Sequence, residues 1–99
     1  MTVKKLMNLK GRRALITGAS GVLGRMMADT LAELGAELIL VDLPETGLSE
    51  CVELIEDKWG VKAHSFSCDL EEQEQRIELL EWIKNTFDGL NILINNAAF

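Results

Sequence analysis

Hydrophobic residues along this chain form short unbroken runs that alternate with longer segments of helical spacing. Unbroken runs lie within residues 13–17, 37–42 and 91–96, and such runs are typical of strands buried on both faces, as in a parallel sheet. Residues 61–69 instead alternate between two sets of positions. This alternation predicts a strand nearer the edge of the sheet.

The segments between these strands carry apolar residues at helical spacing and predict helices over about residues 22–34, 49–59 and 71–87. Each is followed by a glycine, the residue favoured just past a helix end. The first helix is expected to bury one apolar face made of Val22, Leu23, Met26, Met27, Thr30, Leu31 and Leu34. The second is expected to bury Cys51, Val52, Ile55 and Trp59, and the third Ile77, Leu80, Ile83, Lys84 and Phe87.

The order is therefore strand, helix, strand, helix, strand, helix, strand. Regular alternation of this kind predicts an α/β fold with a doubly wound parallel sheet and right-handed crossovers. We expect residues 1–99 to form one domain, incomplete at its C-terminus because the fourth strand lacks an outer neighbour.

The turn between the first strand and the first helix contains three glycines, Gly18, Gly21 and Gly24. In a phosphate-binding turn the first glycine permits the tight bend, the second lets a ligand approach the backbone, and the third lets helix and strand pack closely. The diphosphate of a dinucleotide would then meet unpaired N–H groups at the positive end of the helix dipole. An ordinary strand-to-helix turn is the alternative, but the alternating sheet around it favours a dinucleotide site.

A carboxylate, Asp42, closes the second predicted strand eighteen residues after Gly24. At that place a carboxylate accepts hydrogen bonds from the adenosine ribose and repels a 2′-phosphate, so NAD is favoured over NADP. The residue that follows is Leu43 rather than an arginine. The alternative is an aspartate that only starts a turn before Pro44.

Polar residues also close the third and fourth predicted strands. Asp69 could accept a hydrogen bond from an adenine amino group or cap the helix that begins at about Glu71. Asn95 and Asn96 are followed by the small Ala97, which would let a ligand approach the backbone, although amides after a strand can also form a simple turn.

Composition excludes several function classes. The formal net charge of −6 argues against a nucleic-acid binder, and no apolar run approaches the roughly 18 residues of a membrane span. We therefore expect a cytoplasmic protein. Two cysteines without a CxxC pair and a single histidine predict neither a metal site nor a disulfide framework. Cys51 and Cys68 are therefore interpreted as buried or half-buried thiols, and His64 as a surface or half-buried strand residue.

The chain resembles the short-chain dehydrogenase/reductase family over essentially its whole length. The resemblance is carried by LKGRRALITGAS at residues 9–20, Val-Asp at 41–42, Cys-Asp-Leu at 68–70 and NILINNAA at 91–98. It implies a Rossmann fold that binds NAD(P), in an oxidoreductase that transfers a hydride between nicotinamide and a carbonyl or alcohol. The cofactor-binding residues it implies are Gly18, Ser20, Gly21, Val22, Leu23 and Gly24 for the diphosphate loop, Asp42 and Leu43 for the adenosine ribose, Asp69 and Leu70 for adenine, and Asn96 and Ala97 beside the nicotinamide.

The resemblance has two departures. The TGxxGxxG spacing is that of the larger branch of the family, which contains sugar-nucleotide epimerases, whereas Asn-Asn-Ala belongs to the single-domain branch, with Ala98 in place of its usual glycine. The serine, tyrosine and lysine on which the family's catalysis depends cannot be assigned, since the chain has no tyrosine. We therefore expect the cofactor-binding half of an NAD-dependent enzyme with a small-molecule substrate, a homo-oligomer when complete. The alternatives are a sugar-nucleotide epimerase or dehydratase with bound NAD, or a non-catalytic truncated module.

Overall fold

The predicted elements form in the predicted order. The computed structural model describes residues 7–97, and the last residue of the Asn-Asn-Ala-Ala segment, Ala98, lies outside them. Within these residues the elements are β1 (Arg13–Thr17), α2 (Val22–Glu33), β2 (Glu37–Asp42), α3 (Leu48–Trp59), β3 (Ala63–Ser67), α4 (Gln73–Thr86) and β4 (Ile92–Asn95).

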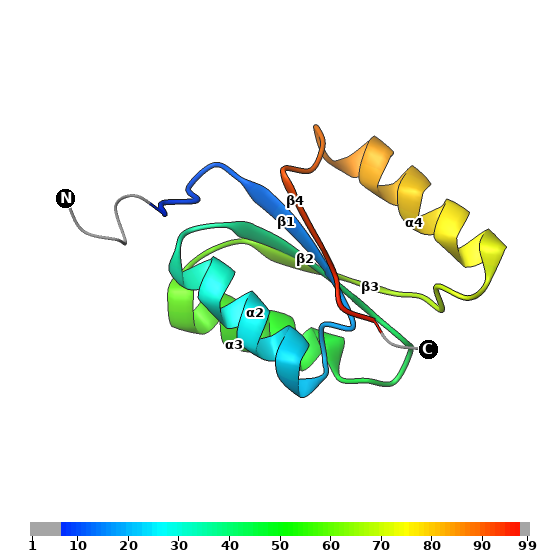
Figure 1. Cartoon of the computed structure of the whole chain (residues 1–99), viewed down its shortest axis with the longest axis horizontal. Coiled ribbons are helices and arrows are strands. Elements are labelled where there is room, and N and C mark those ends of the chain that lie inside the picture. Colours follow the sequence, from blue (N-terminus) through cyan, green and yellow to red (C-terminus); the bar gives the residue numbers. More distant parts are fainter. Residues whose placement is uncertain (1–6, 98–99) are drawn as a thin grey trace.

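The strands form one parallel sheet in the order β3-β2-β1-β4. Helices α2 and α3 lie on one face of this sheet and α4 lies on the other (Figure 1). The doubly wound α/β fold predicted from the sequence is confirmed. The prediction that the third strand lies at an edge is also confirmed. The expectation that the fourth strand is buried on both faces is wrong for the described residues, because β4 forms the other edge and its Leu93 is 66% exposed.

The core has two layers because the sheet is covered on both faces. Successive side chains of a strand point to opposite faces, so β1 and β2 need an unbroken apolar run to fill both layers. The layer under α2 and α3 contains Ala14, Ile16, Leu38 and Leu40. The layer under α4 contains Leu15, Ile39, Val41, Leu79 and Ile83.

Helix α2 buries only part of the face that its large apolar residues indicated, since Met27 and Leu31 are half-buried and pack against the core. Its buried residues are Gly24, Ala28 and Ala32, whereas Val22 is 81% exposed and Met26 is 62% exposed. Residues four apart lie on one face of a helix, and the face made of small side chains lets α2 approach the sheet closely. The hydrophobic pattern predicted that the larger residues are buried, whereas close packing of α2 against the sheet buries the smaller ones.

Helix α4 differs in a similar way. Of the expected face, Ile83 is buried and Phe87 packs against the core, whereas Ile77 and Leu80 are 46% and 65% exposed. Lys84 is also exposed, and Leu79 is buried instead. Apolar residues at 77, 79, 80 and 83 define two overlapping faces, and periodicity cannot choose between them. For α3 the expectation is confirmed, since Cys51 and Ile55 are buried and Val52 and Trp59 pack against the same layer.

Both cysteines are buried and free, as predicted. In the part of the chain that the structure describes, no group of three His, Cys, Asp or Glu side chains is placed to hold a metal ion. Over the same residues, no helix has the length and apolar character needed to cross a membrane.

An ion-pair cluster joins the amino ends of the first three strands. Arg13 Nε donates to Glu37 Oε1 at 3.0 Å, and His64 Nε2 lies 2.7 Å from Glu37 Oε2. The Arg13 guanidinium also lies 4.6 Å from the ring centroid of Phe87 and donates to the Gly89 carbonyl at 2.8 Å. His64, expected on the surface or half-buried, is half-buried and part of this cluster, which also fixes the end of α4.

The cluster gives stability a defined pH dependence. Burial raises the pKa of Glu37, but the hydrogen bonds and charges of His64 and Arg13 outweigh it and hold the pKa below the ordinary 4.5. A carboxyl whose pKa is lower in the folded state contributes stability above its unfolded pKa, and this contribution is lost as the pH falls through the folded pKa.

We therefore expect the protein carrying this chain to lose unfolding free energy below about pH 4.5, and Glu37→Gln to remove part of that loss. Urea titrations from pH 7 to pH 3 measure it. The matched control is Glu53→Gln, at an exposed position on α3. It should keep the wild-type dependence of unfolding free energy on pH. Parallel profiles for Glu37→Gln and wild type would contradict the assignment.

Candidate functional site

A cleft of about 550 Å³ opens at the carboxyl ends of the strands, where each chain segment leaves the sheet. In an open α/β sheet this is the edge at which ligands bind. The lining residues come from four separate turns and are Gly18, Ser20, Gly21, Val22, Leu23, Val41, Asp42, Leu43, Cys68, Asp69, Leu70, Glu71, Asn96 and Ala97. Every cofactor-binding residue implied by the family resemblance lies in this lining except Gly24, and Asn95 also lies outside it.

Gly24 lies beneath the cleft and shapes it. A Cβ on Gly24 would lie 2.2 Å from the Gly18 carbonyl oxygen, and one on Gly18, whose φ is +65°, would lie 3.1 Å from Ala97 Cα. The tight bend at Gly18 and the close helix packing at Gly24 are therefore both present, as expected. A Cβ on Gly21 would make only an ordinary contact, 3.6 Å from Gly18 O. Within the protein, Gly21 is thus the one glycine of the three that an alanine could replace.

Some backbone N–H groups of the glycine turn donate hydrogen bonds within the protein, and others have no acceptor among residues 7–97. The Ser20 N–H donates to Asp42 Oδ2 at 2.9 Å and the Gly21 N–H to Gly18 O at 3.3 Å. The N–H groups of Val22 and Leu23, at the first two positions of α2, have no acceptor among residues 7–97. They lie at the positive end of the helix dipole and line the cleft. These two N–H groups can bind an anion.

Asp42 lies beside this turn at the edge of the cleft and is hydrogen-bonded to it. Its Oδ2 accepts from the Ser20 N–H at 2.9 Å and from Ser20 Oγ at 2.5 Å, and its Oδ1 accepts from the Leu43 N–H at 2.8 Å. Burial raises the pKa of Asp42, but the bonds from Ser20 and Leu43 outweigh it and place the pKa below the ordinary 3.8. The carboxylate is ionised at neutral pH and does more than start the turn before Pro44.

Asp69 lines the cleft without capping the next helix. Its Oδ1 accepts from the Glu71 N–H at 3.0 Å, and α4 begins only at Gln73, with Glu72 at the N-cap position and no side-chain cap. The expectation that Asp69 caps this helix is wrong, because a further turn separates the strand from α4. The Asp69 N–H is bonded to Gln75 Oε1 at 2.7 Å, which orients the segment.

Thr17 is a site-forming residue that the sequence reasoning missed. It is 5% exposed, and its hydroxyl accepts from the N–H groups of Asn96 at 2.9 Å and Ala97 at 3.1 Å. The same hydroxyl donates to Asn95 Oδ1 at 3.2 Å, and Asn96 Nδ2 donates to Gly18 O at 3.3 Å. The segment after β4 is thereby fixed against the glycine turn. The available signal was a single hydroxyl that ends an otherwise apolar strand.

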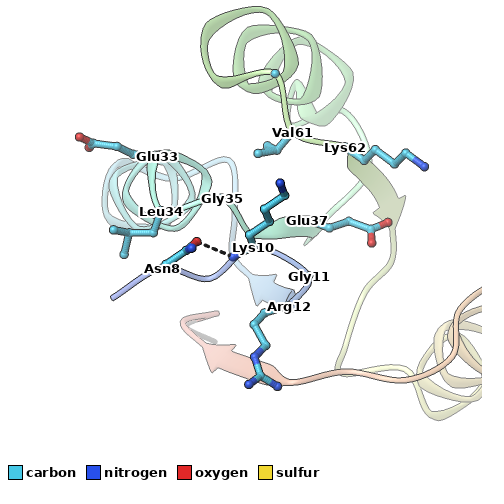
Figure 2. A pocket seen from close by; sticks show the side chains of 11 residues that line it. Asn8, Lys10, Gly11, Arg12, Glu33, Leu34, Gly35, Glu37, Val61 and Lys62 are labelled. Atoms are coloured by element: carbon cyan, nitrogen blue, oxygen red, sulfur yellow. Dashed lines mark hydrogen bonds between the residues drawn. The ribbon is translucent and has the colours of Figure 1, made fainter. Parts of the chain in front are cut away.

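A second, larger cavity of about 860 Å³ lies at the opposite end of the sheet, near Gly35 and Lys62 (Figure 2). Figure 2 shows the Lys10 side chain extending into it, while the side chains of Arg12, Glu33 and Lys62 extend away. The cavity lies beside the carboxyl end of α2, where the helix dipole disfavours anions. The helix end therefore does not favour an anion in this cavity, in contrast to the helix N-terminus at the smaller cleft.

Comparison with known proteins gives matches over nearly the whole chain. A sequence model described as short chain dehydrogenase matches residues 12–99. The bovine (Bos taurus) short-chain dehydrogenase/reductase family 16C member 6 is 35% identical over 95 residues, covering 96% of this chain and 30% of the relative. The chain thus spans about a third of the length of relatives such as this one.

Solved structures of a reductase and a dehydrogenase also match this chain over most of its length. The L-sorbose reductase of Gluconobacter frateurii, complexed with NADPH and L-sorbose, has a TM-score of 0.88 and 31% identity over 94% of this chain and 35% of its own. An NAD⁺-bound xylitol dehydrogenase has a TM-score of 0.84 and 32% identity over 92% of this chain and 35% of its own.

Proposed function

The chain belongs to the short-chain dehydrogenase family, and on that premise we propose that its cleft binds a nicotinamide dinucleotide for an oxidoreductase. The observation that carries the proposal is that two N–H groups without an acceptor among residues 7–97, at Val22 and Leu23, and the ionised Asp42 line one cleft. A dinucleotide offers a diphosphate to the first and ribose hydroxyls to the second. The L-sorbose reductase binds NADPH and the xylitol dehydrogenase binds NAD⁺, which supports this class of ligand.

Each side of the cleft takes one part of the cofactor in this proposal. The diphosphate accepts hydrogen bonds from Val22 and Leu23, and it can approach closely because Gly21 has no side chain. Gly18 and Gly24 hold the turn and the helix in the shape that presents these donors. Ser20 belongs to the same turn and lines the cleft.

The remaining contacts follow the other strand ends. Asp42 and Leu43 face the adenosine ribose. Asp69 and Leu70 face adenine. Asn96 and Ala97 lie beside the nicotinamide ribose, held there by Thr17.

NAD is the preferred cofactor in this proposal. Hydrogen bonds keep Asp42 ionised, so its charge repels a 2′-phosphate while a ribose hydroxyl can donate to it. Leu43, directly after it, offers no positive charge to a phosphate.

The chemistry proposed for the protein that carries this chain is reduction or oxidation of a small carbonyl or alcohol. The nicotinamide ring, when bound, accepts or supplies the hydride. The residues of this chain bind and orient the cofactor as part of one dinucleotide-binding domain, and none of them is assigned to proton transfer. Family membership and the reductases and dehydrogenases among the matches favour this reading over a sugar-nucleotide epimerase.

Titration of the protein with NAD, followed by calorimetry, tests the proposal. We expect saturable binding with one site per chain, and weaker binding by about tenfold in Gly21→Ala, because the added methyl displaces the diphosphate from the backbone donors. The melting temperature of that variant should match wild type, since the Cβ meets only an ordinary contact at 3.6 Å. Absence of NAD and NADP binding to the folded protein would contradict the proposed function.

A further inference from the structure

Three hydrogen bonds already occupy the Asp42 carboxylate. Ser20 supplies two of them, from its N–H and its hydroxyl, and both reach Oδ2. The Leu43 N–H supplies the third, to Oδ1. A carboxylate has about four acceptor sites, two on each oxygen, so Oδ2 is fully used and Oδ1 keeps one acceptor site.

The two bonds to Ser20 also fix how the carboxylate is turned. Ser20 belongs to the glycine turn after β1, and Asp42 ends β2, so the contact spans 22 positions of sequence and joins two walls of the cleft. Hydrogen bonds to an ionised group are short and strong, as the 2.5 Å separation of Ser20 Oγ from Asp42 Oδ2 illustrates. With Oδ2 held by the turn, Oδ1 is the oxygen left to meet a ligand.

We propose that Ser20 is a positioning residue for cofactor selectivity: it holds Asp42 so that Oδ1 alone is offered to the adenosine ribose, where it accepts one hydroxyl and excludes a 2′-phosphate. This inference rests on the proposed function. It assigns Ser20 to the choice between NAD and NADP, a role distinct from the direct diphosphate contact expected from its place in the glycine turn.

The donor inventory supports this division of roles. A serine hydroxyl has one hydrogen, and that hydrogen is given to Asp42 together with the Ser20 N–H. The diphosphate therefore meets the N–H groups of Val22 and Leu23, which have no acceptor among residues 7–97. Without the serine hydroxyl, the Asp42 side chain gains freedom to turn away from a 2′-phosphate, and discrimination against NADP falls.

The test compares Ser20→Ala, Ser20→Thr and the matched control Ser65→Ala, which removes a hydroxyl from an exposed position on β3. Dissociation constants for NAD and NADP are measured for each variant in the protein carrying this chain. We expect Ser20→Ala to reduce the NADP-to-NAD ratio of dissociation constants by about tenfold, as loss of one charge-assisted hydrogen bond implies. Ser20→Thr, which keeps the hydroxyl, and Ser65→Ala should retain the wild-type ratio.

A double-mutant cycle and an NMR titration separate positioning from direct contact. In an Asp42→Ala background Ser20→Ala should leave the ratio unchanged, and in the single variant the pKa of Asp42 should rise because a hydrogen bond to its charged form is lost. Ser20→Gly removes the same hydroxyl and gives the same comparison if the alanine variant does not fold. Equal weakening of NAD and NADP in both backgrounds, with the Asp42 pKa unchanged, would overturn the inference. Failure of wild type to bind either dinucleotide would instead overturn the proposed function.

Discussion

Gly24→Ala is expected to be among the most destabilising substitutions in this chain. The added Cβ would lie 2.2 Å from the Gly18 carbonyl oxygen and 2.9 Å from Ala19 Cα, and both are backbone atoms. Neither can move without shifting the turn or lifting α2 from the sheet. Overpacking of a core typically costs about 1–3 kcal/mol, and a clash with backbone belongs at or above the upper end. We expect a loss of about 3 kcal/mol or more in unfolding free energy, measured by urea denaturation.

Gly21→Ala is the control for this experiment. It adds the same methyl group three positions earlier, where the nearest atom is Gly18 O at 3.6 Å, and it should change the unfolding free energy by less than about 0.5 kcal/mol. The pair separates a glycine required by packing from one required by the ligand. Equal destabilisation by the two substitutions would contradict the packing of α2 described above.

Asp42→Ala is expected to have the largest effect on cofactor choice. In the proposed site, removing the carboxylate deletes a charged acceptor for the ribose and the repulsion toward a 2′-phosphate. Both changes act in the same direction, so the preference for NAD should narrow by about 10- to 100-fold. The measurement is the ratio of NADP and NAD dissociation constants in the protein carrying this chain.

The matched control is Asp57→Ala, at an exposed position on α3 outside the cleft. The ratio of the NADP and NAD dissociation constants for Asp57→Ala should equal that of wild type. If Asp42→Ala also kept that ratio, Asp42 would have to be removed from the adenosine ribose site.

The fold was predictable because the sheet is covered on both faces. Double coverage requires unbroken apolar runs in β1 and β2, and such runs separated by helical segments specify a parallel sheet with little ambiguity. The edge strand β3 was distinguishable because its residues alternate, with Phe66 packed against the core and Ser65 and Ser67 exposed. The edge position of β4 was not, since its apolar run resembles that of a buried strand although Leu93 is 66% exposed.

Helix faces were harder to predict because packing depends on shape as well as hydrophobicity. In α2 the close approach to the sheet requires Ala28 and Ala32, which a count of large apolar residues passes over. Met26 satisfies the periodicity yet stays exposed. Side-chain size becomes decisive only when the distance between layers is known.

The sequence predicted which residues line the candidate site, but not the hydrogen bonds among them. Strand ends place Gly18, Asp42 and Asn96 at one edge of the sheet, and alternation along the chain is enough to foresee this. Which donor meets which acceptor depends on rotamers and turn geometry, so neither the bonds from Ser20 to Asp42 nor those to the Thr17 hydroxyl could be derived from spacing.

The ion-pair cluster at the amino ends of the strands has a consequence for how this protein can adapt. Arg13 and Thr17 mark the two ends of β1, and four residue steps of a strand correspond to about 13 Å. The side chains that contact Glu37 and His64 within residues 7–97, Arg13 and Phe87, do not line the cleft at the carboxyl ends of the strands. Substitutions at Glu37 and His64 can therefore change acid tolerance without removing a residue of that cleft.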